Sequence, residues 1–242
     1  MFAPVRAILL DVEGTTSPIS FVYQTLFPYA RRRIHSFLEQ HGDDFELSSI
    51  METLKRENAA DIPEGAPHFL DRQDQDYAKG VSAYCLWLMD HDRKSTPLKA
   101  LQGLIWREGF TLGELSGEVY EDVAIGLRRW HEHGRRMAIY SSGSVLAQRL
   151  VFGNTRYGDL TKYIHAFFDT SIGGKHDPTS YRHIISKLEA PADETLFISD
   201  VTEELDAAHA AGLQVALSIR PGNAKQANPA AYPAICAFSE LP

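Results

Sequence analysis

Cysteine, long apolar runs and an excess of basic residues are all missing from this sequence. Only two of the 242 residues are cysteine, Cys85 and Cys236, and each stands alone in an apolar segment. This scarcity argues against a disulfide framework or a structural zinc site, and we expect two free, buried thiols. No apolar stretch is long enough to cross a bilayer, and the first residues lack the apolar core of a signal peptide. We therefore expect a cytoplasmic protein without a membrane partner.

Basic residues are outnumbered by acidic ones. The chain has 24 Lys and Arg against 32 Asp and Glu, which gives a formal net charge of -8. General nucleic-acid binding depends on clustered basic side chains, so this balance argues against a nucleic-acid partner. A length of 242 residues suffices for one large domain or two small ones. No coiled-coil pattern or internal repeat indicates an assembly, and we expect a monomer.

Helical periodicity dominates about a hundred residues after the first apolar run. That run, near residues 5–11, predicts a buried strand. Thr96 and Pro97 predict the N-cap and the first position of a later helix, and residues 58–80, rich in Pro, Gly and Asp, predict a loop. Four stripes of apolar residues at helical spacing predict helices around Phe27–Leu38, Leu47–Leu54, Val81–Leu88 and Leu98–Ile105.

Strands and helices alternate from about residue 119. Alternation of this kind implies right-handed βαβ units and a parallel sheet. The expected fold class is therefore α/β, with a Rossmann-like core made of residues 1–17 and 119–242 and an inserted helical cap domain, residues 18–118. The expected strands are 137–140, 166–168, 195–199 and 214–219, and the expected helices include one that ends at Gly134, one near 181–188 and one near 203–211.

Polar residues follow the first strand at once. Asp11 comes directly after the apolar run, and Glu13 and Gly14 come next. Ligands bind at the carboxyl ends of strands in open α/β sheets. Two carboxylates at such a position can act as a nucleophile or metal ligand and as a proton-handling partner. Aspartate and glycine are also ordinary turn formers, so this segment alone leaves both interpretations open.

Three further polar clusters are expected at the same sheet edge. Ser141-Ser142-Gly143-Ser144 leads from a strand into a helix, where hydroxyls and N–H groups bind anions, although serines also cap helices. Lys175 lies in a Gly-rich loop and is either a phosphate ligand or a solvated side chain. Asp200 repeats the strand-end placement of the first aspartate. Glu203 and Glu204 behind it can be purely structural, because acidic residues favour the first turn of a helix.

The clusters together contain the parts that phosphoryl transfer requires. Carboxylates from two strand ends suit Mg²⁺, which binds through one or two carboxylates, substrate phosphate and water. A serine-rich helix start and a lysine can hold the remaining phosphate oxygens. Together they supply a nucleophile, charge neutralisation and positioning.

In their order along the chain, these motifs resemble those of the haloacid-dehalogenase-like phosphatases. Asp11-Val-Glu-Gly-Thr-Thr, the strand ending in Ser141, Lys175 and Asp200 match the four motifs of that superfamily, and Glu13 replaces its usual second aspartate. Nearly the whole chain resembles the enolase-phosphatase of methionine salvage, although His176-Asp177-Pro178 departs from the family's usual tripeptide. The phrases that carry this narrower resemblance are Asp11-Val-Glu-Gly-Thr-Thr-Ser-Pro-Ile-Ser-Phe-Val, Tyr140-Ser-Ser-Gly-Ser-Val, Phe168-Asp-Thr, Asp200-Val-Thr-Glu-Glu-Leu-Asp-Ala-Ala and Arg220-Pro-Gly-Asn-Ala.

The resemblance implies an activity, a cofactor and a set of site residues. Family members convert 2,3-diketo-5-methylthiopentyl 1-phosphate to an acireductone and phosphate, by enolisation and then dephosphorylation, with Mg²⁺. We therefore expect one Mg²⁺ per subunit and a small phosphorylated diketone as substrate. The implied metal ligands are Asp11, Glu13 and Asp200, and Glu13 would bind through its carboxylate or its backbone carbonyl. The implied substrate-binding residues are Ser141, Ser142 and Lys175.

Our mechanistic hypothesis gives the chemistry to Asp11, Glu13 and Lys175. Asp11 attacks phosphorus, Lys175 neutralises phosphate charge, and Glu13 protonates the leaving alcohol and then activates water. Glu13 is also the first candidate for the enolisation base, and a residue of the helical cap is the alternative. Three rival functions stay open: a phosphomonoesterase of the same superfamily without enolase activity, a dehalogenase, and a phosphate-binding or partner-binding protein that is not an enzyme.

Overall fold

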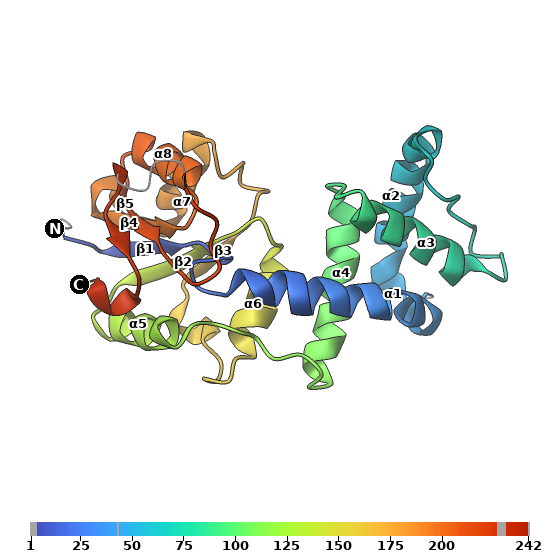
Figure 1. Cartoon of the computed structure of the whole chain (residues 1–242), viewed down its shortest axis with the longest axis horizontal. Helices are drawn as coiled ribbons and strands as arrows, with labels where there is room; N and C mark the ends of the chain where they lie inside the picture. Colours follow the sequence, from blue (N-terminus) through green and yellow to red (C-terminus); the bar gives the residue numbers. More distant parts are fainter. Residues whose placement is uncertain (1–3, 43, 227–230, 242) are drawn as a thin grey trace. The chain divides into compact units, whose positions relative to one another are not determined.

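The protein consists of two compact units, each with its own secondary structure (Figure 1). In this computed structural model the described residues are 4–42, 44–226 and 231–241. The first unit combines Met1–Tyr23 with Gly113–Pro242, and the second is Gln24–Leu112. The polar strand ends singled out in the sequence all belong to the first unit.

A six-stranded parallel sheet forms the centre of the first unit, in the order β3-β2-β1-β4-β5-β6. The strand β1 lies between β2 and β4, with Leu10 opposite Ile139 on one side and Ile198 on the other. Continuous apolar runs form these strands because both faces of a parallel sheet are covered. The strands are β1 Ala7–Leu10, β2 Arg136–Tyr140, β3 Ala166–Phe168, β4 Thr195–Ser199, β5 Gln214–Ser218 and β6 Ala234–Ile235.

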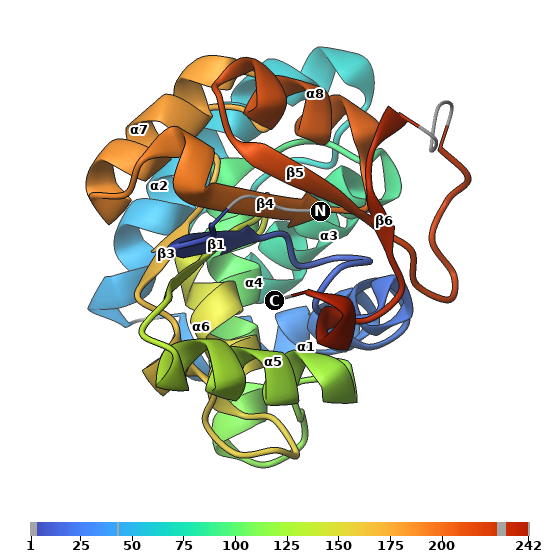
Figure 2. The same ribbon diagram turned by 90° about the vertical axis from the view of Figure 1, so that its left-hand side faces the viewer.

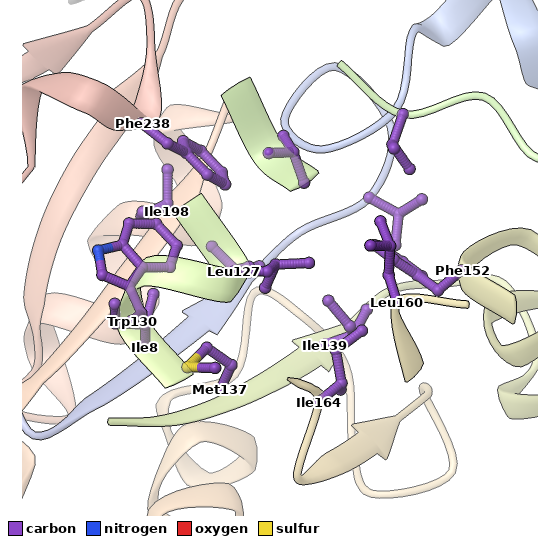
Figure 3. Packing of buried hydrophobic residues seen from close by; sticks show 14 of the residues in the cluster. Ile8, Leu127, Trp130, Met137, Ile139, Phe152, Leu160, Ile164, Ile198 and Phe238 are labelled. Carbon is purple, nitrogen blue, oxygen red and sulfur yellow. The ribbon is translucent and has the colours of Figure 1, made fainter. Parts of the chain in front are cut away.

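Helices cover both faces of this sheet, as Figure 2 shows. On one face, Leu127 and Trp130 pack with Phe238 and sheet residues such as Met137 (Figure 3). On the other face, Tyr181 belongs to a second buried apolar cluster. The α/β fold class predicted from the sequence is confirmed. The helices are α5 Glu121–Glu132, α6 Val145–Gly153, α7 Pro178–Leu188 and α8 Thr202–Ala210, with short 3₁₀ turns η3 Thr161–Tyr163, η4 Ala192–Glu194 and η6 Phe238–Glu240.

Four amphipathic helices make up most of the second unit. Their apolar stripes face one another, and Ile34, Leu54 and Leu101 are almost completely buried. The indole N–H of Trp106 donates to the carbonyl of Leu26, 2.8 Å away. The helices are α1 Phe27–His41, α2 Phe45–Asp61, α3 Tyr77–Asp90 and α4 Thr96–Thr111, and the shorter η1 Phe21–Leu26, a π-helix, and η2 Ile62–Glu64 precede α1 and follow α2.

The cap of α4 differs from the sequence prediction by one residue. Ser95, not Thr96, is the N-cap, because its hydroxyl accepts a hydrogen bond from the N–H of Leu98 at 3.2 Å. Thr96 is already helical, so Pro97 occupies the second helical position. Both residues are compatible with a helix start, and only the contact decides between them.

The loop predicted at residues 58–80 is shorter than expected, because α2 continues to Asp61 and α3 begins at Tyr77. Asn58 explains the longer helix. Its side chain is buried, donates to the carbonyl of Pro67 at 2.7 Å and accepts from the N–H of Phe69 at 2.9 Å. These contacts fasten the returning chain to the last turn of α2.

The two cysteines differ in exposure. Cys85 is free and buried, as predicted, whereas Cys236 is free but exposed, so its predicted burial is wrong. Cys236 follows the two-residue edge strand β6, and its N–H donates to the Glu240 carboxylate at 2.8 Å. An edge strand is covered less than a central one. None of the helices in the described part of the chain has the length and apolar character of a membrane span.

Candidate active site

The turn that follows β1 holds Asp11 at the centre of the sheet edge. The N–H of Asp11 donates to the carbonyl of Ile198 at 3.0 Å, and only 2% of the residue is exposed. The turn is tight because the carbonyl of Val12 accepts hydrogen bonds from three successive N–H groups, at 3.2, 3.0 and 2.9 Å. The hydroxyl of Thr16 donates to the carbonyl of Asp11 at 2.9 Å. A backbone so extensively bonded presents the carboxylate in one position.

Lys175 lies between two carboxylates. Its ammonium group forms ion pairs with Asp11 and with Oε2 of Glu204, the latter at 2.7 Å. Only 9% of its side chain is exposed. Burial lowers the pKa of Lys175, but the charges of Asp11 and Glu204 outweigh this effect and raise it above its usual range. The alternative of a solvated lysine is therefore wrong.

Tyrosine and serine hydroxyls hold the glycine-rich loop that carries Lys175. Tyr140 donates to the carbonyl of Gly173 at 2.8 Å, and Tyr181 donates to the carbonyl of Lys175 at 2.7 Å. Ser180 donates to the carbonyl of Gly174 at 2.8 Å. Three successive carbonyl groups of the loop, those of residues 173–175, thus accept side-chain hydrogen bonds, and these bonds fix the backbone of Lys175. The loop sequence itself does not indicate these contacts.

The serines of the segment 141–144 have different contacts. Ser141 is 1% exposed and donates to Oε2 of Glu13 at 3.2 Å, so it joins the carboxylate cluster. Ser142 is exposed. Ser144 is the N-cap of α6 and accepts from the N–H of Ala147 at 3.2 Å. The capping interpretation therefore describes Ser144 and not Ser141.

Burial raises the pKa of Glu13, and the charge of Asp11 raises it further, although Lys175 partly offsets both effects. A raised pKa favours the protonated acid more than in an exposed glutamate, so this side chain can both give and take a proton. Glu13 therefore has the electrostatic environment of a general acid and base.

Asp200, at the end of β4, faces the same turn. Burial, followed by the charge of Asp11, raises its pKa to about 7. A Cβ atom added to Gly14 would lie 2.4 Å from Oδ2 of Asp200, so only glycine fits at position 14. Gly14 also has a φ of +73°, which side chains with a Cβ adopt at a cost. Asp200 and the turn of Asp11 are thus in close contact.

Glu204 is the site residue that the sequence interpretation missed. It is 7% exposed, accepts from the hydroxyl of Ser199 at 2.8 Å and pairs with Lys175. Burial, with the charge of Asp11 second, raises its pKa to about 7. The sequence feature that could have identified Glu204 is its position four residues after Asp200. In the first turn of a helix, this position directs the side chain back toward the strand end. The purely structural interpretation suits the exposed Glu203.

Negative charge exceeds positive charge at this edge. The ammonium of Lys175 pairs with the carboxylates of Asp11 and Glu204, and its charge also acts on those of Glu13 and Asp200. Burial raises the pKa of Glu13, Asp200 and Glu204. A hard cation would relieve this excess, and the all-oxygen donor set suits Mg²⁺. No group of three His, Cys, Asp or Glu side chains among the described residues is placed to hold a metal alone. The fit is thus to a cation that completes its shell with backbone oxygen, water and phosphate.

Replacing Gly14 by alanine is expected to destabilise the protein by about 2–5 kcal/mol, because left-handed strain adds to overpacking against Asp200. Urea unfolding measures the loss. Gly134→Ala is the matched control: Gly134 has the same φ of +73°, but its added Cβ would meet nothing within 4 Å. The control should lose only about 1–2 kcal/mol. Equal losses in the two variants would show that the contact with Asp200 is unimportant.

Comparison with known proteins places this chain in a family. Residues 5–212 match the haloacid dehalogenase-like hydrolases. The chain is 44% identical to an enolase-phosphatase E1 of Thioalkalivibrio sulfidiphilus over 224 residues, 93% of this chain and 94% of the relative. The protein belongs to the enolase-phosphatase E1 family of haloacid dehalogenase-like hydrolases. The family resemblance stated from the sequence is confirmed, and the protein is a phosphatase.

A further member and one solved structure agree with this assignment. An enolase-phosphatase E1 of Frankia alni is 45% identical over 234 residues, 96% of this chain and 93% of its own. The crystal structure of the UTR4 protein of Saccharomyces cerevisiae has a TM-score of 0.80 at 34% identity, and the match covers 98% of this chain and 100% of that one. The fold of the yeast protein therefore matches that of this chain over nearly its whole length.

Proposed function

We propose that this family member is a bifunctional enolase-phosphatase. Its substrate is 2,3-diketo-5-methylthiopentyl 1-phosphate, and its products are the acireductone 1,2-dihydroxy-3-keto-5-methylthiopentene and phosphate, as in methionine salvage. The observation that carries the proposal is the pairing of Lys175 with Asp11, beside Glu13 and Asp200, in a chain 44% identical to an enolase-phosphatase E1. We further propose that it acts as a cytoplasmic monomer with one Mg²⁺, whose ligands are the carboxylates of Asp11 and Asp200 and the backbone carbonyl of Glu13.

Asp11 is the nucleophile in the proposed dephosphorylation. Its carboxylate attacks phosphorus, the bond to the substrate's alcohol oxygen breaks, and an aspartyl-phosphate forms. Lys175 keeps Asp11 oriented and neutralises phosphate charge. Mg²⁺, when bound, supplies further neutralisation of the charge on phosphate and carboxylates. Ser141 and Ser142 bind substrate in this proposal.

Glu13 is the proton-transfer group in both proposed reactions. In enolisation it takes a proton from the carbon next to a carbonyl. In dephosphorylation the protonated acid gives a proton to the leaving alcohol, and the carboxylate then takes one from the attacking water. Its raised pKa supports both directions of transfer. The hydrogen bond from Ser141 supports a fixed orientation for the carboxylate.

The proposal is tested by incubating the purified chain with the diketone phosphate and Mg²⁺. Ultraviolet absorbance follows the enol, and a colorimetric assay follows phosphate. We expect the enol to form first, phosphate to follow in equal amount, and chelation of Mg²⁺ to stop phosphate release. Phosphate release without a preceding enol would instead identify a plain phosphomonoesterase, the alternative function. A chain that turns over neither this substrate nor simple phosphate esters would contradict the proposal entirely.

A further inference from the structure

Asn223 forms a hydrogen bond with the turn that carries Asp11, although the two lie more than two hundred residues apart in the chain. It follows β5, and its Nδ2 donates to the carbonyl of Gly14 at 2.9 Å and to the carbonyl of Ser218 at 3.2 Å. An amide nitrogen has two hydrogens, and both are used here. The direction of the amide group is therefore fixed, and its oxygen points away from these two carbonyls.

The oxygen of that amide has no partner in the described part of the chain. Oδ1 of Asn223 is buried and accepts no hydrogen bond from the described residues. A Cβ atom added to Gly14 would lie 2.8 Å from this oxygen and 2.4 Å from Oδ2 of Asp200, so the two oxygens are at most about 5.2 Å apart. One water molecule with hydrogen bonds of ordinary length spans such a separation. A donor placed between these two acceptors would satisfy both.

We infer that Asn223 is a positioning residue for the divalent cation. Its Oδ1 accepts a hydrogen bond from a water molecule that coordinates the cation held by Asp200, while its Nδ2 holds Gly14 in place. A coordinated water is a strong donor, and groups in this outer position orient the ligands of metal sites. The inference rests on the proposed function, because it requires a cation at Asp200.

Arg220 makes the proposal testable without loss of the turn. It is 7% exposed, donates to the carbonyl of Thr15 at 3.3 Å and pairs with both oxygens of Asp122 at 3.0 and 2.8 Å. Its guanidinium also lies 4.5 Å from the ring centre of Tyr120. These contacts hold the residue next to Gly14 independently of Asn223.

The test measures Mg²⁺ affinity by isothermal titration calorimetry on the whole chain, without substrate. We expect Asn223→Ala to weaken binding about 10–100-fold. Gln226→Ala is the matched control, because this amide lies in the same loop but accepts from the N–H of Thr202 at 3.2 Å instead. The control should bind Mg²⁺ like the parent. If Asn223→Ala does not fold, Asn223→Ser is measured in its place. It is expected to show the same weakening of Mg²⁺ binding, about 10–100-fold, because the serine hydroxyl is too short to replace the amide oxygen.

If Asn223→Ala bound Mg²⁺ within twofold of the parent affinity, the inference would be overturned. A lower melting temperature in that variant would then show that Asn223 only stabilises the turn. A parent chain that binds no Mg²⁺ overturns both this inference and the metal in the proposed function. If the parent binds Mg²⁺ and Asn223→Ala binds it equally well, only the inference about Asn223 fails and the metal in the proposed function stands.

Discussion

Asparagine in place of Asp11 is expected to lower phosphate release by about 10⁴-fold or more, because an amide oxygen is not a nucleophile. The shape of the side chain is conserved, and Lys175 keeps its second ion pair with Glu204 at 2.7 Å. The site should therefore stay folded. Phosphate release under saturating diketone phosphate measures the effect, and circular dichroism checks the fold.

The same variant separates the two reactions. Enol formation should persist in Asp11→Asn, because proton abstraction is given to Glu13. Asp177→Asn is the matched control: Asp177 is exposed and caps α7 two residues after Lys175, and asparagine caps helices equally well. That variant should release phosphate normally. Normal phosphate release by Asp11→Asn would disprove the nucleophile assignment.

Methionine in place of Lys175 is expected to lower kcat/KM for phosphate release by about 10²–10³-fold. The substitution keeps an unbranched side chain up to Cε and removes the ammonium that pairs with Asp11 and Glu204. Breaking a buried ion pair costs about 3–5 kcal/mol, and carboxyl groups with raised pKa values can reduce this cost by taking up a proton. Steady-state kinetics and urea unfolding measure the two effects.

Lys162→Met is the control for this prediction. Lys162 is exposed, and its ammonium lies 5.1 Å from the ring centre of Tyr163, where it contacts none of the site carboxylates described above. The control variant should keep both activity and stability. If Lys175→Met retained the kcat/KM of the parent, charge neutralisation by this lysine would not contribute to the reaction.

Much of the sheet was predictable because its strands leave a strong local signal. A strand buried on both faces reads as an unbroken apolar run, and β3 and β4 begin and end at the predicted residues, 166–168 and 195–199. The two-residue strand β6 was missed, since two residues cannot establish a period. The N-cap of α4 was misplaced by one residue for another reason: Ser95 and Thr96 both suit a helix start, and only the hydrogen bond of the Ser95 hydroxyl decides between them.

The sequence by itself determined a parallel α/β sheet with Asp11, Ser141 and Asp200 at strand ends, because burial imposes apolar runs and the chain turns where they stop. Only the tertiary structure decided which polar groups meet there. It paired Lys175 with Asp11 across 164 positions and placed Glu204 2.7 Å from the same ammonium. Such pairings depend on strand order and loop conformation, and no local pattern records the distance between residues so far apart in the chain.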